Sequence, residues 1–166
     1  LRVPDEARAA VLEIGMNHPG EIIALAEIAK PDVAVITMVG RVHLEGLGSV
    51  EAIATEKSAL LLPLASDGVA IVNGDSPLLD EAVARRRIRA RTLRFGNRGK
   101  GLDLRLVERA VNERGQRILV SDGFTADLQL PGEHNATNAL AAIAVGRAFG
   151  ISEANVKVGL AAVAPA

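Results

Sequence analysis

The sequence predicts an α/β fold in which helices flank a mostly parallel sheet, with a small antiparallel β-meander. Two patterns indicate this fold class. Short apolar, β-branched runs alternate with helical segments up to about residue 95, and helices return after residue 131, which is the order of a parallel α/β sheet. Between residues 100 and 130, apolar and polar residues alternate instead, as they do in antiparallel strands with one face in water.

The first part of the chain is expected to alternate buried strands with helices. Apolar runs predict strands at residues 11–15, 33–37, 69–72 and 92–95. The first helix begins with an acidic turn at Glu21 and stops at Pro31, and its apolar face is expected to hold Ile22, Ile23, Ala26 and Ile28. Two more helices are expected, from the cap Ser49 to about Leu64 and from the cap Ser76 to about Arg86.

The later part of the chain changes its period and then returns to helix. Alternating residues predict strands at 102–107, 117–120 and 126–130, with turns at 112–115 and 122–123. An Ala-rich helix should follow Pro131 and reach about Phe149, and a last helix should run from the cap Ser152 to Ala162. We therefore expect one domain over residues 1–166, with an α/β core at 1–95 and 131–166 and an antiparallel subdomain at 100–130.

Composition excludes several classes of function. The chain of 166 residues holds 19 Lys and Arg against 20 Asp and Glu, for a net charge of −1, which argues against nucleic-acid binding. It contains no cysteine, so thiolate metal sites and cysteine nucleophiles are excluded. No apolar run approaches the ~20 residues of a transmembrane helix, and no signal peptide is visible. We expect a cytoplasmic protein without membrane contact, and a chain that starts at Leu1 is expected to be a piece of a larger one.

Three loops at the carboxyl ends of predicted strands are candidate sites, because ligands of parallel sheets bind at that edge. These loops cover residues 13–20, 38–48 and 73–75, and they are rich in Gly, His, Asn and acidic residues. Within the first, Glu13 lies in an apolar run. It is either a strand-end residue that reaches solvent or a salt bridge, or a ligand of a hard cation such as Mg²⁺.

The other candidate residues also carry two interpretations each. His43 is either a hydrogen-bonded loop residue or a functional histidine, and Lys57 is either a solvated helix lysine or part of a site. His134, Asn135 and Asn138 open the Ala-rich helix; the two Asn residues share a helix face, and Asn amides can read an adenine edge. Six arginines between residues 85 and 94 form either a solvated surface or a polyanion site. No Gly-x-x-x-x-Gly-Lys-Ser/Thr phosphate loop is present.

Four stretches in order resemble the central domain of the Mur ligases. They are LEIGMNHPGEI at 12–22, VGRVHLEGLGSVEAIATEKSALL at 39–61, VAIVNGD at 69–75 and LPGEHNATNALAAIAVGRAFG at 130–150. Each stretch alone is a weak signal, but four in order with compatible spacing are a strong one. The stretch from Asn17 to Ile22 favours the family members that add D-alanyl-D-alanine.

The resemblance implies an ATP-dependent ligase that adds D-alanyl-D-alanine to UDP-N-acetylmuramoyl-tripeptide in peptidoglycan precursor synthesis, through an acyl phosphate. It implies ATP and Mg²⁺ as cofactors, since metal ions neutralise the transferring phosphoryl group. The implied metal ligands are Glu13 and His43, with Lys57 as a carbamate that supports the second metal. Asn138, His134 and Asn135 would lie on the adenine side of ATP, and Asn17 and His18 would face the peptide or the phosphate site.

The chain also departs from the family pattern. The family's phosphate loop and its N- and C-terminal domains are absent from this sequence, so we expect the isolated chain to be inactive and an exposed sheet edge to favour a homodimer. Two alternatives stay open at this point. One is another Mur ligase or a folylpolyglutamate synthetase relative, and the other is a non-catalytic α/β module that has lost the phosphate loop.

Overall fold

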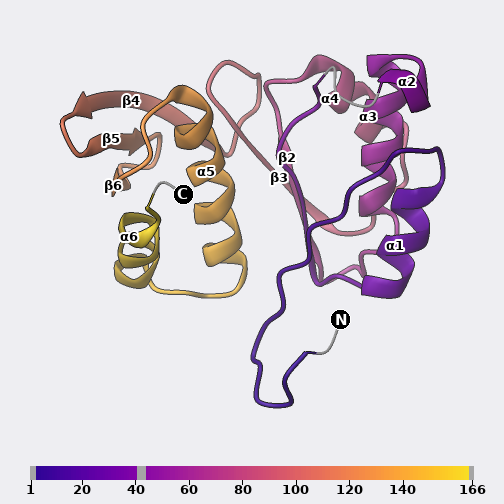
Figure 1. The fold of residues 1–166 in the computed structure, drawn as a ribbon, viewed down its shortest axis with the longest axis horizontal. Coiled ribbons are helices and arrows are strands. Elements are labelled where there is room, and N and C mark those ends of the chain that lie inside the picture. The colour runs from indigo at the N-terminus through magenta and orange to yellow at the C-terminus, as the bar shows by residue number, and fades with distance from the viewer. Residues whose placement is uncertain (1–2, 41–43, 165–166) are drawn as a thin grey trace.

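A six-stranded sheet in the order β1-β2-β3-β4-β5-β6 forms the centre of the molecule (Figure 1). The computed structural model describes residues 3–40 and 44–164. Strands β1 (Val33–Ile36), β2 (Val69–Asn73) and β3 (Arg91–Gly96) run parallel, and so does the start of β4 (Leu104–Asn112) beside β3. Strands β5 (Gly115–Val120) and β6 (Thr125–Leu128) continue the sheet antiparallel. The predicted fold class is confirmed.

Helices begin where the sequence places capping residues. Helices α3 (Val50–Ser58), α4 (Pro77–Ala84) and α6 (Glu153–Ala162) each start after a serine whose hydroxyl accepts a backbone N–H, as predicted. The remaining helices are α1 (Glu21–Ala29), α2 (Leu44–Leu47), α5 (Glu133–Ala148) and the single 3₁₀ turn η1 (Ala59–Leu61). Helix α2 was not predicted, because its four residues lie in a glycine-rich segment that reads as loop.

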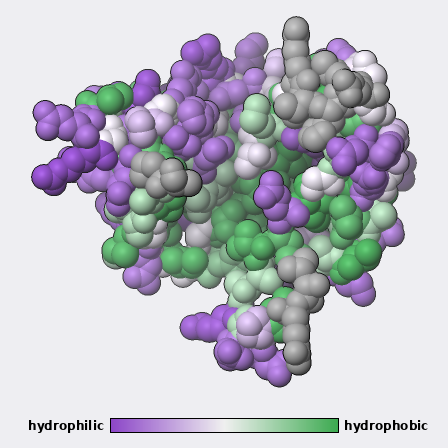
Figure 2. All heavy atoms as spheres, viewed as in Figure 1, coloured by the Kyte–Doolittle hydropathy of each residue, from purple (hydrophilic) through white to green (hydrophobic). Residues whose placement is uncertain are grey.

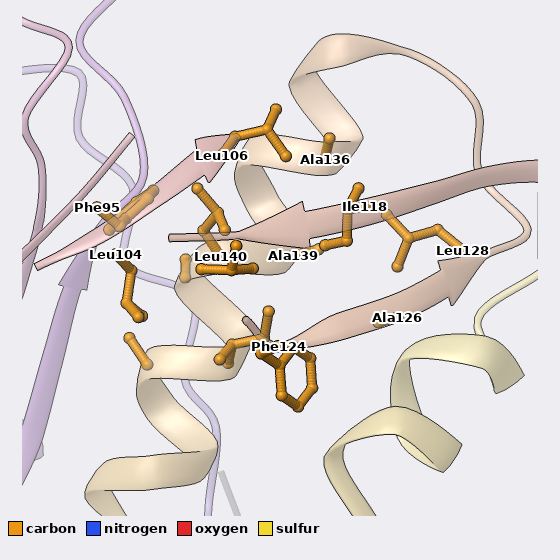
Figure 3. Close-up of a cluster of buried hydrophobic side chains, with 14 of the residues drawn as sticks. Phe95, Leu104, Leu106, Ile118, Phe124, Ala126, Leu128, Ala136, Ala139 and Leu140 are labelled. Atoms are coloured by element: carbon orange, nitrogen blue, oxygen red, sulfur yellow. The ribbon is translucent and has the colours of Figure 1, made fainter. Parts of the chain in front are cut away.

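Alternation along the parallel strands sends side chains to two different cores. On one face, Ala34 and Ile36 of β1 pack with residues of η1 and α4. On the other face, Ile71 and Phe95 pack under α5, together with the antiparallel strands. Figure 3 shows this second core, in which leucines of β4 and Ile118 of β5 point toward the alanine-rich face of α5.

The face of the parallel strands that lies under α5 is only partly covered. Val33 and Val35 of β1, Val69 of β2 and Leu93 of β3 are half-buried. In Figure 2 apolar side chains gather in the middle of the face viewed, between the positions of α5 and α1 in Figure 1. One helix is too narrow to cover three strands.

The predicted strand at residues 11–15 is wrong. This segment is extended, but it pairs with no strand in the described part of the chain, and Val11 is 96% exposed. An apolar, β-branched run becomes a strand only when a neighbour satisfies its backbone N–H and C=O groups. Local pattern alone could not show that β1 pairs with β2 and leaves residues 11–15 unpaired.

The predicted apolar face of α1 is wrong at one position. Ile22 and Ala26 are buried and Ile23 is half-buried, whereas Ile28 is 80% exposed. Residues four apart share a helix face, and Ile28 lies six residues from Ile22, on the other side of the helix.

Within the described part of the chain, no helix is both long and apolar enough to cross a bilayer.

Candidate functional site

The carboxyl ends of β1 and β2 are joined by the side chain of Asn73, the last residue of β2. Its Nδ2 donates a hydrogen bond of 2.6 Å to the carbonyl oxygen of Thr37, and its Oδ1 accepts one of 2.9 Å from the N–H of Asp75. Asn73 is only 8% exposed. Its amide therefore fixes the loop after β1 to the loop after β2, where ligands of parallel sheets bind.

Asp75 holds the loop that follows β3. Its carboxylate accepts hydrogen bonds from the backbone N–H groups of Asn97 at 2.8 Å and of Arg98 and Gly99 at 2.7 Å. The side chain of Asn97 then donates to Glu133 Oε1 at 2.9 Å, in the first turn of α5. These contacts connect the ends of β2 and β3 to the start of α5, which carries the predicted adenine residues.

Lys57 lies on α3 and reaches back to the end of β1. Its Nζ donates a hydrogen bond of 2.7 Å to the carbonyl oxygen of Met38, one residue past the Thr37 that Asn73 contacts. The side chain is half-buried, and this burial lowers the pKa of the Lys57 ammonium below its ordinary value. The lysine is therefore part of the same edge of the sheet and is not a fully solvated helix residue.

The loop that holds Asn17 and His18 is fastened by the first residue of α1. Oε2 of Glu21 accepts the N–H groups of Asn17 at 2.6 Å and His18 at 3.0 Å, and its Oε1 lies 3.0 Å from His18 Nδ1. The backbone donors of Asn17 and His18, followed by the His18 side chain, lower the pKa of Glu21 to about 2. The side chains of Asn17 and His18 stay exposed on a fixed backbone.

Two further contacts place this loop beside α2 and α3. Oε1 of Glu56 accepts the N–H groups of Gly20 at 2.9 Å and of Ile22 at 3.1 Å. Gly46 of α2 packs so closely on Asn17 that a Cβ there would lie 2.0 Å from the Asn17 carbonyl oxygen. Parts of two predicted loops, 13–20 and 38–48, therefore lie close together, since Asn17 contacts Gly46 and the start of α1 is bonded to α3.

The sequence predicts Glu13 within a buried strand, but in the structure it lies outside any strand. It is exposed in the extended segment, while its neighbours Ile14 and Met16 pack against Ile53 of α3. The structure removes only the predicted strand around Glu13, and its exposed carboxylate is compatible with both interpretations, a residue that reaches solvent and a ligand of a hard cation. His43 lies outside the described residues.

The predicted adenine residues open α5 beside a cavity. Asn135 and Asn138 line a cavity of about 190 Å³ whose other walls are apolar, from β6, α5 and α6: Leu128, Leu130, Ala139, Ala142, Leu160 and Val163. Asn135 also donates 2.7 Å from Nδ2 to the carbonyl oxygen of Pro131. His134 is exposed and is not among the lining residues.

The turn before α5 is held from behind by Gln116, a residue that the sequence analysis missed. Its side chain is 1% exposed, and its Nε2 donates to the carbonyl oxygens of Leu130 at 2.6 Å and Gly132 at 2.9 Å. Gly132 has a φ of +104°, which favours glycine, and the His134 ring occupies the space of a Cβ. A glutamine in an alternating strand gives no local signal for such a partner.

Two arginines of the run at residues 85–94 have partners within the fold. Arg86 donates from Nε to Ser58 Oγ and from Nη2 to the Thr55 carbonyl, so it caps the end of α3, and Arg94 pairs with Asp80 at 3.2 Å. Arg86 and Arg94 therefore stabilise the fold. The solvated-surface interpretation applies to the other arginines of the run. Among residues 3–40 and 44–164, no three His, Asp or Glu side chains gather as a metal cluster.

This fold and this edge of the sheet define a class of protein. The chain matches the Mur ligase middle domain over residues 1–146, so it belongs to the Mur ligase family.

Two curated relatives of this chain carry the same name. The chain is 39% identical over 162 residues to the UDP-N-acetylmuramoyl-tripeptide–D-alanyl-D-alanine ligase of Bacillus subtilis, covering 96% of this chain and 34% of the relative. It is 32% identical over 166 residues to the ligase of the same name from Escherichia coli, covering 97% and 36%. The chain thus spans about a third of the length of the curated relatives it matches.

Solved structures agree with this comparison. MurF from Acinetobacter baumannii superposes with a TM-score of 0.85 at 30% identity, over 99% of this chain and 36% of that one. MurF from Thermotoga maritima, solved in complex with ADP, superposes with a TM-score of 0.75 at 29% identity, over 90% of this chain and 34% of that one.

Proposed function

We propose that this chain is the middle domain of an ATP-dependent ligase that adds D-alanyl-D-alanine to UDP-N-acetylmuramoyl-tripeptide. The observation that carries the proposal is the 39% identity over nearly the whole chain to a ligase of that name. The hydrogen-bonded edge from Lys57 to the start of α5 supports it, because it groups side chains that the resemblance assigns to one active site. The ligase acts through an acyl phosphate in the cytoplasm, and the domain alone is inactive.

The cavity at the start of α5 fits the base of a nucleotide. Its lining is apolar apart from Asn135 and Asn138, whose amides can pair with the edge of an adenine. The relative from Thermotoga maritima was solved with ADP, which supports nucleotide use by the family. We assign the adenine of ATP to this cavity, with His134 at its rim.

Lys57 is suited to become a carbamate. The neutral amine, and not the ammonium, attacks the carbon of CO₂ and releases a proton, and burial of Lys57 favours the neutral form. The product is an anion held at the end of β1. We propose that this anion supports a metal ion there.

The donor set fits Mg²⁺ in a site completed by the substrates. Mg²⁺ takes hard oxygen ligands and usually binds one or two carboxylates plus phosphate oxygens and water, and Glu13 offers an exposed carboxylate. We propose Glu13 and His43 as its protein ligands. When bound, Mg²⁺ supplies charge neutralisation at the transferring phosphoryl group.

The residues of the first loop would handle the acyl donor, the muramoyl tripeptide. Glu21 fixes the backbone of Asn17 and His18, so that their exposed side chains project from a set position beside α3. We propose that they bind the peptide of UDP-N-acetylmuramoyl-tripeptide and orient its terminal carboxylate, which gains reactivity from fixed geometry.

The proposal is tested in the complete ligase by following release of phosphate that depends on both D-alanyl-D-alanine and the muramoyl tripeptide. Glu13→Ala, His43→Ala and Lys57→Ala are each expected to lower kcat at least about a hundredfold, the usual loss for one electrostatic stabiliser. Glu27→Ala, which removes an exposed carboxylate from α1, is the matched control and should stay near wild type.

Two results would contradict the proposal. A wild-type ligase that forms no amide with D-alanyl-D-alanine, but does so with another amino acid, would place the chain in another branch of the family. Near-normal turnover by Glu13→Ala or Lys57→Ala would remove the corresponding assignment.

A further inference from the structure

We propose that Glu56 is a positioning residue for the muramoyl peptide, because it fixes the Asn17–Gly20 loop to the helix that carries Lys57. The inference rests on the proposed function, since it concerns the substrate of that same site. Glu56 is one residue from Lys57, but the two side chains contact different loops. Helix α3 thereby serves as the common support of both.

The contact with Glu56 replaces a cap that α1 lacks. The N-cap of α1 is Gly20, in the left-handed region at a φ of +88°, and a glycine has no side chain to accept the free N–H groups of the first turn. Glu56 supplies that acceptor from 34 to 36 residues away, with Oε1 2.9 Å from the Gly20 nitrogen and 3.1 Å from the Ile22 nitrogen. Hydrogen bonds to an ionised carboxylate are the stronger kind.

The loop is then held at both of its ends. Glu21 binds the N–H groups of Asn17 and His18 at one end, and Glu56 binds Gly20 and Ile22 at the other. Of these two carboxylates, Glu21 belongs to the loop's own helix and moves with it. Among residues 3–40 and 44–164, only Glu56 ties the loop to another part of the fold by a side-chain hydrogen bond.

Because Gly46 packs against the Asn17–Gly20 loop, the hydrogen bonds to Glu56 determine where that loop lies. Gly46 lies directly against the Asn17 carbonyl, so a shift of the loop toward α2 is sterically blocked. A shift away from α2 and α3 is opposed by the two hydrogen bonds to Glu56. Loss of Glu56 should therefore let Asn17 and His18 move away from the end of β1, where Lys57 is bonded to the Met38 carbonyl.

Glu56 is proposed to position the peptide loop, and it does not contact the reacting atoms. The proposed adenine cavity lies at α5, and within the described part of the chain no hydrogen bond or ion pair joins its lining residues to Glu56, so ATP binding should not depend on this residue. A loop that holds the peptide should affect binding of the peptide alone. Glutamine at position 56 keeps one carbonyl oxygen that can accept from both N–H groups, so it should preserve the function.

The test is a kinetic comparison of Glu56→Ala, Glu56→Gln and the control Glu27→Ala in the complete ligase. Glu56→Ala is expected to raise KM for the muramoyl tripeptide about tenfold, equivalent to about 1.4 kcal/mol, with KM for ATP within about twofold of wild type. Glu56→Gln and Glu27→Ala should stay within about twofold for both substrates. Equal changes in both KM values, or none, would overturn the proposal.

Hydrogen exchange at the amides of residues 17–22 provides the second measurement, and it needs no turnover. Exchange in Glu56→Ala should be about tenfold faster there while the amides of β2 stay protected, which also shows that the variant is folded. Unchanged exchange would overturn the anchoring by Glu56, and Glu56→Gln decides the matter if the alanine variant does not fold. A wild-type ligase that rejects D-alanyl-D-alanine would overturn the proposed function instead, and the exchange result would still decide whether Glu56 anchors the loop.

Discussion

Replacing Gln116 by methionine should lower the free energy of unfolding, because the buried Gln116 amide is hydrogen-bonded to the turn before α5. Methionine has about the same length and fills the same buried space, so the packing change is small. What is lost is the amide, which donates hydrogen bonds to the carbonyl oxygens of Leu130 and Gly132 at 2.6 and 2.9 Å and accepts one of 3.3 Å from Arg109 Nη1. Those two carbonyls lie in half-buried residues before α5.

The magnitude follows from the number of bonds lost. Each neutral hydrogen bond contributes a net of about 0.5–1.5 kcal/mol, so the two bonds to main-chain carbonyls give roughly 1–3 kcal/mol, with a central value of about 2. The longer bond from the exposed Arg109 is expected to add less than about 0.5 kcal/mol. For a domain of this size 1 kcal/mol corresponds to a change in Tm of about 2–4 °C, so we expect Tm to fall by roughly 4–8 °C.

The assay is urea and thermal unfolding of the 166-residue chain, with Gln129→Met as the matched control. Gln129 is exposed and donates one hydrogen bond of 2.6 Å to the Ala161 carbonyl, so its loss should change the free energy of unfolding by less than about 0.5 kcal/mol. If Gln116→Met and Gln129→Met changed stability equally, the reasoning that burial of the Gln116 amide sets its contribution would be refuted.

Two further predictions concern charged groups. Because the Glu21 pKa falls to about 2 in the folded chain from an ordinary 4.5, its stabilising effect is complete above about pH 4.5 and is lost as the pH falls toward 2. The amide NMR shifts of residues 17 and 18 should titrate with that low midpoint; a midpoint near 4.5 would show that the contacts do not persist in solution. Arg147→Ala should cost about 1 kcal/mol, because this arginine pairs with Asp122 and Glu153 and lies 5.5 Å from the Phe124 ring centroid. Arg117→Ala, which breaks an exposed pair with Asp127, should have a smaller effect in the same unfolding assay, and the opposite order would contradict the argument.

Local patterns predicted most of the secondary structure because the relevant physics is local. The caps at Ser49, Ser76 and Ser152 each accept an N–H three residues away, so the sequence itself contains both partners. The same reasoning failed at residues 11–15, where strand formation depends on a partner far away in the chain. It also did not show that β4 joins β3 before it turns into the antiparallel part.

The candidate site divides in the same way. The residues named from sequence, such as Lys57 and Asn135, lie in stretches that resemble the family, and that resemblance rather than their local chemistry made them candidates. Glu56 and Gln116 have ordinary chemistry, and their partners lie 14 to 36 residues away. Only coordinates could show that these residues hold the predicted ones in place.

These supporting contacts form a nearly continuous path along the carboxyl edge of the sheet. Lys57 bonds to Met38, the adjacent Thr37 bonds to Asn73, and Asn73 and Asp75 lead through the loop after β3 to Glu133 at the start of α5. Most of these contacts have a main-chain group as one partner, so they fix the paths of loops and leave the exposed side chains free for ligands. In a ligase, the acyl carboxylate and the γ-phosphate must meet at close range, and misplacement by about 1 Å is costly. We propose that the contacts that link the end of β1 to the proposed nucleotide cavity meet that requirement with residues that need not touch either substrate.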